Sequence, residues 1–341
     1  MSDLKTTIPK GSLVLVTGVT GFVASQVAKQ FLERGYKVRG TVRDIAKAAW
    51  LVEDVLKSYI DDGVFELALV PDIAADHALD EAVKGVSAVV HLATIATFDP
   101  DPNKVVPQTV AGTMSALEAA MKEPSVQQFV YTSSKGAALI PSIGEDTNVG
   151  RDTWNDKAVQ LAWAPPPYEP SRGLLVYFAS KVAAEKAVWK FVKERKPHFT
   201  VNVISPAGII GEPLNKKQIG FTASWIPQLY EGKTTYLDTS VSIYFVDVKD
   251  VALLHVAAAL DPDVKNARFH IWGQHSSWTD IAAIMRKLRP HHKSIPEFPT
   301  PEYLTISTDQ TEIVALLKNW GSHGGWRPLE ETVADNLSVC E

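Results

Sequence analysis

Short apolar segments alternate with longer segments of helical character along the first 206 residues of the chain. The apolar segments are rich in valine and isoleucine, and most of them carry apolar residues on both faces. Strands of this kind are typical of a parallel sheet that helices cover on both sides. The predicted strands are LVLVTG (13–18), KVRGTVR (37–43), FELALVPD (65–72), AVVHLAT (88–94), QFVYTSS (128–134) and TVNVISP (200–206).

Helices are expected between these strands. Gly35 stands where the first of them should end, because glycine readily adopts the left-handed conformation that closes many helices. The alternation of strands and helices predicts the α/β class, with a doubly wound parallel sheet. The predicted helices span residues 22–34, 75–85, 107–122 and 175–195.

The alternation stops near residue 206, where glycine and proline begin to interrupt the chain. We therefore expect residues 1–206 to form mainly a large domain around the sheet, and residues 207–341 to form mainly a smaller region. DVKDVALLHVAAAL (247–260) is predicted to be a helix that packs back on the large domain. The proline-rich segment 141–173 is predicted to be a long loop, and such loops are usually functional or mobile.

Composition and charge narrow the class of protein. The chain has 341 residues, of which 45% are hydrophobic and 21% charged, as in ordinary globular proteins. Its net charge of −5, with scattered lysines and arginines, argues against nucleic acid as a partner. The single cysteine, Cys340, allows no intrachain disulfide, and the polar start of the chain lacks the apolar stretch of a signal peptide or membrane anchor. We expect a cytoplasmic protein without a membrane segment.

A glycine-rich turn joins the first predicted strand to the first predicted helix. Gly18, Gly21 and Ala24 follow one another at three-residue spacing in LVLVTGVTGFVAS. The first glycine permits a tight turn, the second lets backbone N–H groups approach a pyrophosphate, and the small third residue lets helix and strand pack closely. This turn between a strand and a helix predicts a Rossmann-type dinucleotide site.

The end of the second predicted strand indicates which dinucleotide binds there. An acidic residue at this place holds a free ribose hydroxyl, whereas arginine accommodates a 2′-phosphate. Arg43 ends the strand and Lys47 follows it, which favours NADP(H), although Asp44 could also face the ribose. Asp72 and Ile73, after the third strand, lie where the adenine would bind in such a fold.

Tyr177 and Lys181 are four residues apart in LLVYFASK, so on a helix they share one face. An ammonium group near the phenol would lower the pKa of the tyrosine and make it a usable proton donor to a carbonyl. A hydroxyl is also needed to hold the carbonyl oxygen. Ser133 and Ser134 supply two candidates at the carboxyl end of a predicted strand, where open α/β sheets bind ligands.

With these motifs the sequence resembles the extended short-chain dehydrogenase/reductase family, and within it the branch of dihydroflavonol reductases and fungal NADPH-dependent aldehyde and ketone reductases. The resemblance runs from about residue 11 to about residue 330. It rests on VTGVTGFVAS, GYKVRGTVRD, VVHLAT, FVYTSS, VYFASKVAAEKAVWKF and ISPAGIIGEP.

The resemblance implies a role for each matching residue. Ser134, as the last of the serine pair, Tyr177 and Lys181 match the catalytic serine, tyrosine and lysine. It also implies that residues 1–206 hold the NADP site and the catalytic residues, and that residues 207–341 bind the substrate. The residues that match the cofactor site are Gly18, Gly21, Phe22, Arg43, Lys47, Asp72, Ile73, Ala93, Thr94, Tyr177, Lys181, Pro206, Ala207 and Ile209.

The expected activity is therefore NADPH-dependent reduction of a small carbonyl compound to an alcohol. Phe98 and Trp225 are the candidate aromatic residues of an apolar substrate pocket, together with Ser134. Two alternatives stay open: a sugar-nucleotide epimerase or dehydratase on the same scaffold, and a regulator that binds NADP without catalysis. Lys135 departs from the family, which usually has a small or uncharged residue after the serine.

No metal site is expected. His291 and His292 are adjacent, and no cluster of cysteine or acidic residues accompanies them. His91 ends an apolar strand and is interpreted as a hydrogen-bonded structural residue rather than a catalytic base.

Overall fold

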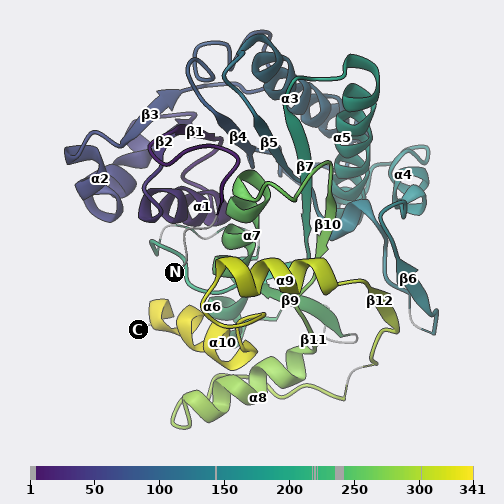
Figure 1. The fold of residues 1–341 in the computed structure, drawn as a ribbon. Coiled ribbons are helices and arrows are strands. Elements are labelled where there is room, and N and C mark those ends of the chain that lie inside the picture. Colours follow the sequence, from purple (N-terminus) through teal and green to yellow (C-terminus); the bar gives the residue numbers. More distant parts are fainter. Residues whose placement is uncertain are drawn as a thin grey trace.

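The computed structural model describes residues 5–142, 144–216, 218, 220, 222–234, 242–300 and 302–340. A parallel sheet of seven strands lies at the centre of the large part, in the order β10-β7-β5-β4-β1-β2-β3 (Figure 1). This confirms the predicted doubly wound α/β fold. The strands are β1 (Leu13–Val16), β2 (Lys37–Val42), β3 (Phe65–Leu69), β4 (Ala88–His91), β5 (Gln128–Thr132), β7 (Thr200–Pro206) and β10 (Arg268–Ile271).

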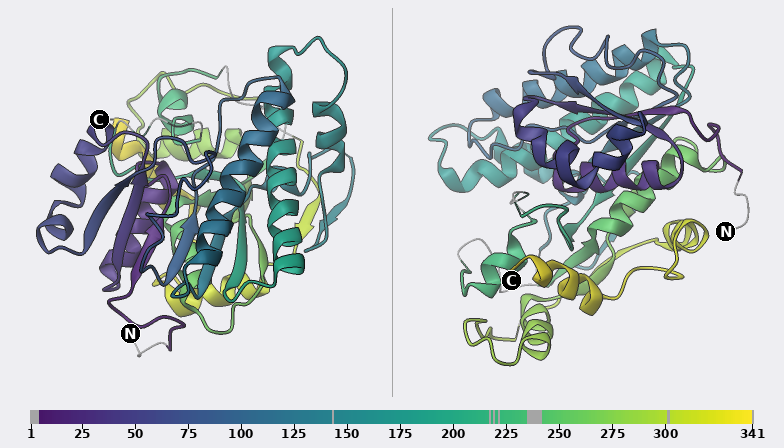
Figure 2. Two further views of the ribbon diagram at one scale, coloured as in Figure 1. Left: turned by 90° about the horizontal axis from the view of Figure 1, so that it is seen from above. Right: turned by 90° about the vertical axis from the view of Figure 1, so that its left-hand side faces the viewer.

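Helices cover both faces of this sheet. Helices α1 (Phe22–Glu33) and α7 (Val248–Leu260) lie on one face, and α3 (Pro102–Lys122) and α5 (Gly173–Arg195) lie on the other (Figure 2, left). Alternate residues of β1 supply the two cores: Val14 and Val16 pack toward α1 and α7, whereas Leu15 packs toward α3 and α5. The strands are therefore apolar on both faces because each face is buried.

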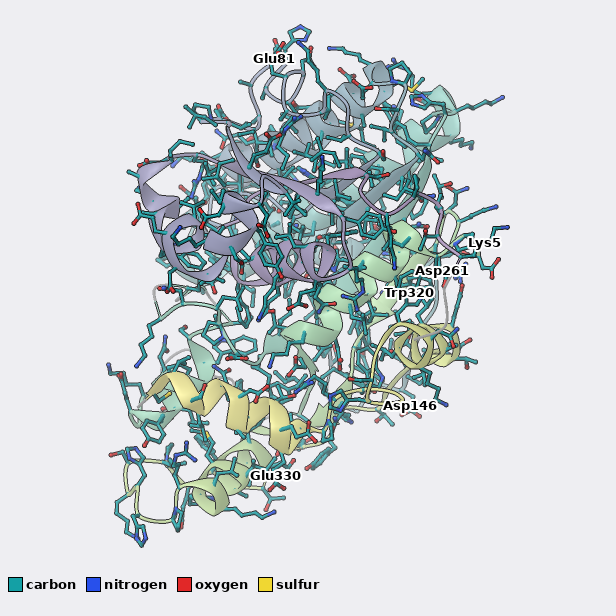
Figure 3. The ribbon with its side chains drawn as sticks, turned by 60° about the vertical axis from the view of Figure 1, so that its left-hand side comes forward. Lys5, Glu81, Asp146, Asp261, Trp320 and Glu330 are labelled. Carbon is teal, nitrogen blue, oxygen red and sulfur yellow. The ribbon has the colours of Figure 1, made fainter. Side chains whose placement is uncertain are left out.

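Helix α7 is buried along nearly its whole length. It lies between the sheet, α1 and helix α9 (Thr311–Trp320), and its connection leads into β10 at the sheet edge. At the end of α7, the Trp320 indole donates a hydrogen bond of 2.8 Å to Asp261, and Figure 3 shows the two side chains next to each other. The segment 247–260 thus forms the expected helix and packs on the large sheet.

The chain after β7 builds a second, smaller group of elements below the sheet (Figure 2, right). A three-stranded sheet combines β8 (Gly208–Ile210), β9 (Ile243–Asp247) and β11 (Gln274–Ser276). It packs with α6 (Trp225–Tyr230), α8 (Trp278–Leu288) and α10 (Leu329–Leu337) around a core that includes Phe245 and Trp278.

Two local predictions are wrong. Residues 75–85 form a series of turns instead of a helix, because His77 and Gly85 have positive φ angles of 61° and 72° that interrupt helical geometry. Segment 141–173 is not a plain loop: it contains β6 (Thr147–Val149), which pairs with β12 (Ile306–Thr308), and helix α4 (Asp156–Ala162). The buried Asn155 caps α4, and its amide donates to the Gly136 carbonyl oxygen.

The remaining helices are short. They are η1 (Ala46–Ala48), η2 (Leu51–Val55), α2 (Lys57–Asp61), η3 (Lys135–Ala137), η4 (Pro170–Arg172) and η5 (Ser338–Cys340). Within the described ranges, no helix has both the length and the apolar character that crossing a membrane requires.

Candidate active site

A cavity of about 440 Å³ lies where the carboxyl ends of β1, β4, β5 and β7 meet the smaller C-terminal group of elements. In parallel α/β sheets this edge is the usual place for ligands. The segments that follow these strands, helix α5 and the region around α6 all contribute to the wall. Of the predicted site residues, the cavity is lined by Gly18, Gly21, Phe22, Thr94, Phe98, Ser134, Tyr177, Lys181, Pro206, Ala207, Ile209 and Trp225.

The turn between β1 and α1 is shaped by the absence of side chains at its glycines. Gly18 has a φ of +68°, and a Cβ atom placed on it would lie 3.3 Å from Ala93. Ala93 is held there because the Thr17 hydroxyl oxygen accepts hydrogen bonds from the N–H groups of both Leu92 and Ala93, each at 3.0 Å. Ala93 therefore supports the glycine turn from behind and is not part of the cavity lining.

The residues predicted to hold the adenosine end lie outside the cavity lining. Arg43 and Lys47 are exposed at the end of β2 and just beyond it. The Asp44 carboxylate accepts a hydrogen bond of 2.9 Å from the N–H group of Ala46, so it is engaged by its own turn. Beyond β3, Asp72 accepts a hydrogen bond from the N–H group of Ala74 in the same way.

Ile73 packs against helix α3 at Gly112. A Cβ atom on Gly112 would lie 3.1 Å from the Ile73 side chain, so the glycine lets α3 approach this loop closely. None of the described carboxylates forms an ion pair with Arg43 or Lys47, and both cations are available to a phosphate. These features suit a phosphorylated dinucleotide.

Tyr177 lies on α5, one helical turn after Gly173. Ser134 lines the cavity together with Tyr177. Burial raises the pKa of Tyr177 above its ordinary value, and the neighbouring Ser134 side chain lowers it by less. At neutral pH the phenol is therefore protonated and has a proton to donate.

Lys181 follows Tyr177 by one turn, as predicted, but it does not lower the pKa of the phenol in this structure. Its ammonium group donates a hydrogen bond of 3.1 Å to the Thr132 carbonyl oxygen and lies 5.5 Å from the centre of the Tyr131 ring. Burial lowers the pKa of Lys181 to about 8, while the Glu185 carboxylate raises it. The prediction that Lys181 lowers the pKa of Tyr177 is therefore corrected. Burial is the largest influence on the pKa of this phenol, and it raises that pKa.

Glu185 is a residue that the sequence analysis missed. It is fully buried, one turn beyond Lys181, and it forms an ion pair with the buried Arg268 at 2.5 Å. The Ser133 hydroxyl donates its hydrogen bond to the second oxygen of the same carboxylate. The repeated four-residue spacing of Tyr177, Lys181 and Glu185 is the signal that places them on one helical face.

Aromatic side chains form much of the remaining wall. The ring of Phe98 lies 5.4 Å from that of Tyr177, and Phe98 has a positive φ of 52°. Gly173 makes this approach possible, because a Cβ atom there would lie 2.2 Å from the Phe98 carbonyl oxygen. Elsewhere in the lining, the Trp225 ring meets the Trp278 ring edge-to-face, with the ring centres 5.4 Å apart.

Trp278, Ile243 and Thr222 also line the cavity and were not predicted. All three come from the C-terminal region, which lacks a recognisable local motif. Ile243 begins β9, Trp278 begins α8 and Thr222 lies just before α6, so all three reach the cavity because the C-terminal elements fold beneath the large sheet.

His91 lies behind the site and not in its lining. Burial lowers its pKa to about 3, so its ring is neutral, and one ring nitrogen shares a hydrogen bond of 3.1 Å with the Thr17 hydroxyl. In the described part of the chain, no three histidine, cysteine or acidic side chains gather in a way that could hold a metal ion.

The sequence of the chain is similar to those of several known proteins. A sequence model of the NAD dependent epimerase/dehydratase family matches residues 14–271. The chain is 38% identical over 336 residues to the NAD-dependent epimerase/dehydratase terH of Aspergillus terreus, covering 98% of this chain and 97% of that protein. It is also 38% identical over 331 residues to aldehyde reductase 2 of Sporidiobolus salmonicolor, covering 96% of each.

The fold is likewise similar to that of solved reductases. Gre2 from Candida albicans, solved in complex with NADPH, superposes with a TM-score of 0.81 and 26% sequence identity, over 96% of this chain and 98% of that chain.

Proposed function

Because the chain belongs to the NAD dependent epimerase/dehydratase family, within the extended short-chain dehydrogenases/reductases, we propose that it is an NADPH-dependent carbonyl reductase. It converts aldehydes and ketones to alcohols. The observation that carries the proposal is that Tyr177, Ser134 and Lys181 line one cavity together with Gly18 and Gly21 of the glycine turn. A proton donor, a hydroxyl and a dinucleotide turn in one cavity are what carbonyl reduction needs.

The residues present fit NADP(H). The left-handed Gly18 and the neighbouring Gly21 leave the turn without side chains, and backbone N–H groups there would hold the pyrophosphate. Arg43 and Lys47 would hold the 2′-phosphate, because both are exposed cations and neither forms an ion pair with a described carboxylate. The similarity to Gre2, whose structure contains NADPH, supports the same choice.

The other predicted contacts are proposed for the rest of the cofactor. Asp72 and Ile73 would lie beside the adenine, and Lys181 would hold the nicotinamide ribose. Phe22 and Thr94 would flank the part of the cofactor between these two ends, and Ala93 would contribute through the glycine turn that it supports. Pro206, Ala207 and Ile209 would lie against the nicotinamide. When bound, NADPH supplies the hydride that the carbonyl carbon receives.

The chain's own residues then supply orientation and a proton. Ser134 donates a hydrogen bond to the carbonyl oxygen and fixes its position next to Tyr177. Tyr177 transfers its phenolic proton to that oxygen as negative charge develops there. The raised pKa of Tyr177 keeps the phenol protonated before each turnover. Phe98 and Trp225 exclude water and provide an apolar surface for the organic part of the substrate.

This assignment also gives the two parts of the chain their roles. We propose that residues 1–206 mainly bind NADP and carry the catalytic residues, and that residues 207–341 mainly bind substrate. Helix α7 and strand β10 come from the second part and complete the first, since they pack on the large sheet.

An NADPH-oxidation assay over a panel of aldehydes and ketones tests the proposal. A carbonyl reductase consumes NADPH only when a carbonyl compound is present and forms the matching alcohol. A sugar-nucleotide epimerase, the first alternative, would interconvert nucleotide sugars without net consumption of NADPH. A regulator would bind NADPH and turn over nothing, and either of these results would reject the proposed function.

A further inference from the structure

Lys135 places a positive charge in the wall of the cavity. It directly follows Ser134 and begins η3 (Lys135–Ala137), and its side chain is partly buried. Residue 136 is glycine, and a Cβ atom there would lie 2.0 Å from the Phe178 ring. The turn after Ser134 is therefore pressed directly against helix α5, which keeps Lys135 at the cavity with Tyr177 and Phe178.

Among the residues that the structure describes, no acidic side chain balances the charge of Lys135. Lys135 and Lys181 are the charged residues of the lining, and none of its described members is acidic. Lys181 has partners, because it donates to the Thr132 carbonyl oxygen and lies one turn before Glu185. In the portions of the chain that the structure describes, Lys135 has neither an ion-pair partner nor a side-chain hydrogen bond.

A partly buried cation without a partner is unfavourable, and burial lowers the pKa of Lys135 to about 8. At neutral pH most of the side chain is still charged. An anionic group that enters the cavity would gain a charge-assisted hydrogen bond with this ammonium and would relieve its desolvation. The neighbouring wall, with Phe98, Trp225 and Trp278, offers apolar contacts to the rest of such a ligand.

We propose that Lys135 binds a carboxylate of the substrate, so that the enzyme prefers ketones that carry an acid group a few bonds from the carbonyl over neutral ketones of the same shape. This inference rests on the proposed reductase function. Lys135 follows the residue that orients the carbonyl oxygen, so the carboxylate and the reacting carbonyl would be held by adjacent residues. Lys135 is then a specificity-determining residue and takes no part in the proton transfer.

A pair of ketones that differ in one group tests the proposal. Benzoylpropionate and butyrophenone share the same aryl ketone, and a carboxylate in the first replaces a terminal methyl in the second. The ratio of kcat/KM for the acid to kcat/KM for the neutral ketone is measured with NADPH for the unmodified protein and for Lys135→Met. We expect this ratio to fall by roughly 10- to 100-fold in the variant, the range for loss of a charge-assisted hydrogen bond.

Two further variants serve as controls for the charge at position 135. Lys135→Arg keeps the charge and should retain most of the preference for the acid. Lys157→Met removes the same charge from an exposed position on α4 and should leave the ratio unchanged. An unchanged ratio in Lys135→Met would overturn the proposal. So would a rise in the KM for NADPH that is equal for both ketones, since it would assign Lys135 to the cofactor.

The unmodified protein gives a readout that does not depend on a folded variant. Phenylbutyrate should inhibit butyrophenone reduction competitively, and phenylbutanol, its neutral counterpart, should inhibit much more weakly; equal inhibition would count against the proposal. If the protein reduces butyrophenone and other neutral ketones but disfavours benzoylpropionate, the reductase function stands and the carboxylate site is wrong. If it reduces no carbonyl compound at all, the proposed function itself fails.

Discussion

The Ser133 hydroxyl donates a hydrogen bond of 2.5 Å to the buried Glu185 carboxylate, whereas the next residue along the chain, Ser134, lines the cavity with Tyr177. A hydroxyl has one proton to donate, so the bond to Glu185 commits that of Ser133. Glu185 is in turn fixed by Arg268. The two adjacent serines are therefore assigned different tasks, and Ser134 is the one left to face a carbonyl oxygen.

Substitution of each serine in turn should separate these tasks. Ser134→Ala is expected to lower kcat/KM for ketone reduction by roughly 10²-fold, the scale of losing one donor to a developing oxyanion. Ser133→Ala should act mainly on stability and lower the free energy of unfolding by about 1 to 2 kcal/mol, since Glu185 loses one partner. Steady-state kinetics and urea unfolding measure the two effects. A larger loss of kcat/KM in Ser133→Ala than in Ser134→Ala would reverse the assignment.

Cofactor preference should depend on Arg43. Arg43→Gln is expected to raise the KM for NADPH by roughly 10- to 100-fold and to leave the KM for NADH nearly unchanged, because only NADPH carries the 2′-phosphate. Arg39→Gln, on the strand that precedes Arg43, is the matched control, since the Arg39 side chain is held by Glu66 and by the carbonyl oxygens of Ala82 and Lys84. An unmodified protein that used NADH as well as NADPH would refute the role of Arg43.

Trp225 should influence which carbonyl compounds react. Its ring lines the cavity and meets Trp278 edge-to-face, so Trp225→Ala removes apolar wall from one side. We expect kcat/KM for bulky aryl ketones to change by about 10-fold relative to small aldehydes, in line with the apolar contact that one aromatic side chain provides. Trp163→Ala, at an exposed position outside the cavity lining, is the control. Equal effects of the two substitutions on this ratio would remove Trp225 from the pocket.

The lowered pKa of Lys181 predicts a dependence on alkaline pH. Its ammonium form is lost as the pH rises through about 8, so the KM for NADPH should rise above that pH and stay flat below pH 7. The effect on the free energy of unfolding has the opposite direction. Lysine titrates near 10.5 in the unfolded chain, so between pH 8 and 10.5 the unfolded chain binds more protons than the folded one. The contribution of Lys181 to the free energy of unfolding therefore increases with pH in this range.

Lys135 titrates in the same range, and the measurement has to separate the two lysines. The NADPH profile should therefore be recorded with a neutral ketone in the Lys135→Met variant as well. Persistence of the alkaline rise in that variant assigns it to Lys181, and its disappearance would assign it to Lys135.

The framework of the fold was predictable because most strands of the large sheet are buried on two faces and therefore form apolar runs in the sequence. The strand 200–206, for example, is found at the predicted residues. The 75–85 segment was not, since a left-handed His77 and a turn glycine override a helical pattern of apolar residues. The elements inside 141–173 depend on distant partners: β6 exists because β12, about 160 residues later, pairs with it.

The site divides in the same way. Residues that form local motifs, such as Gly18 with Gly21 and Tyr177 with Lys181, could be named from spacing alone, and the cavity brings them together. The pKa of Tyr177 could not be predicted, because its direction depends on how deeply the phenol is buried. The position of Lys135 in the cavity wall could not be predicted either, because it depends on the contact between Gly136 and the Phe178 ring.

The role of Tyr177 as proton donor is tested by measuring ketone reduction in the Tyr177→Phe variant. The substitution removes the phenolic hydroxyl and keeps the ring that packs beside Phe98, so the fold and the affinity for NADPH should survive. With NADPH binding measured by fluorescence titration as the control, kcat for ketone reduction is predicted to fall by roughly 10²-fold or more, the scale of general-acid catalysis. A variant that binds NADPH normally and still reduces ketones at nearly the full rate across pH would show that Tyr177 is not the proton donor.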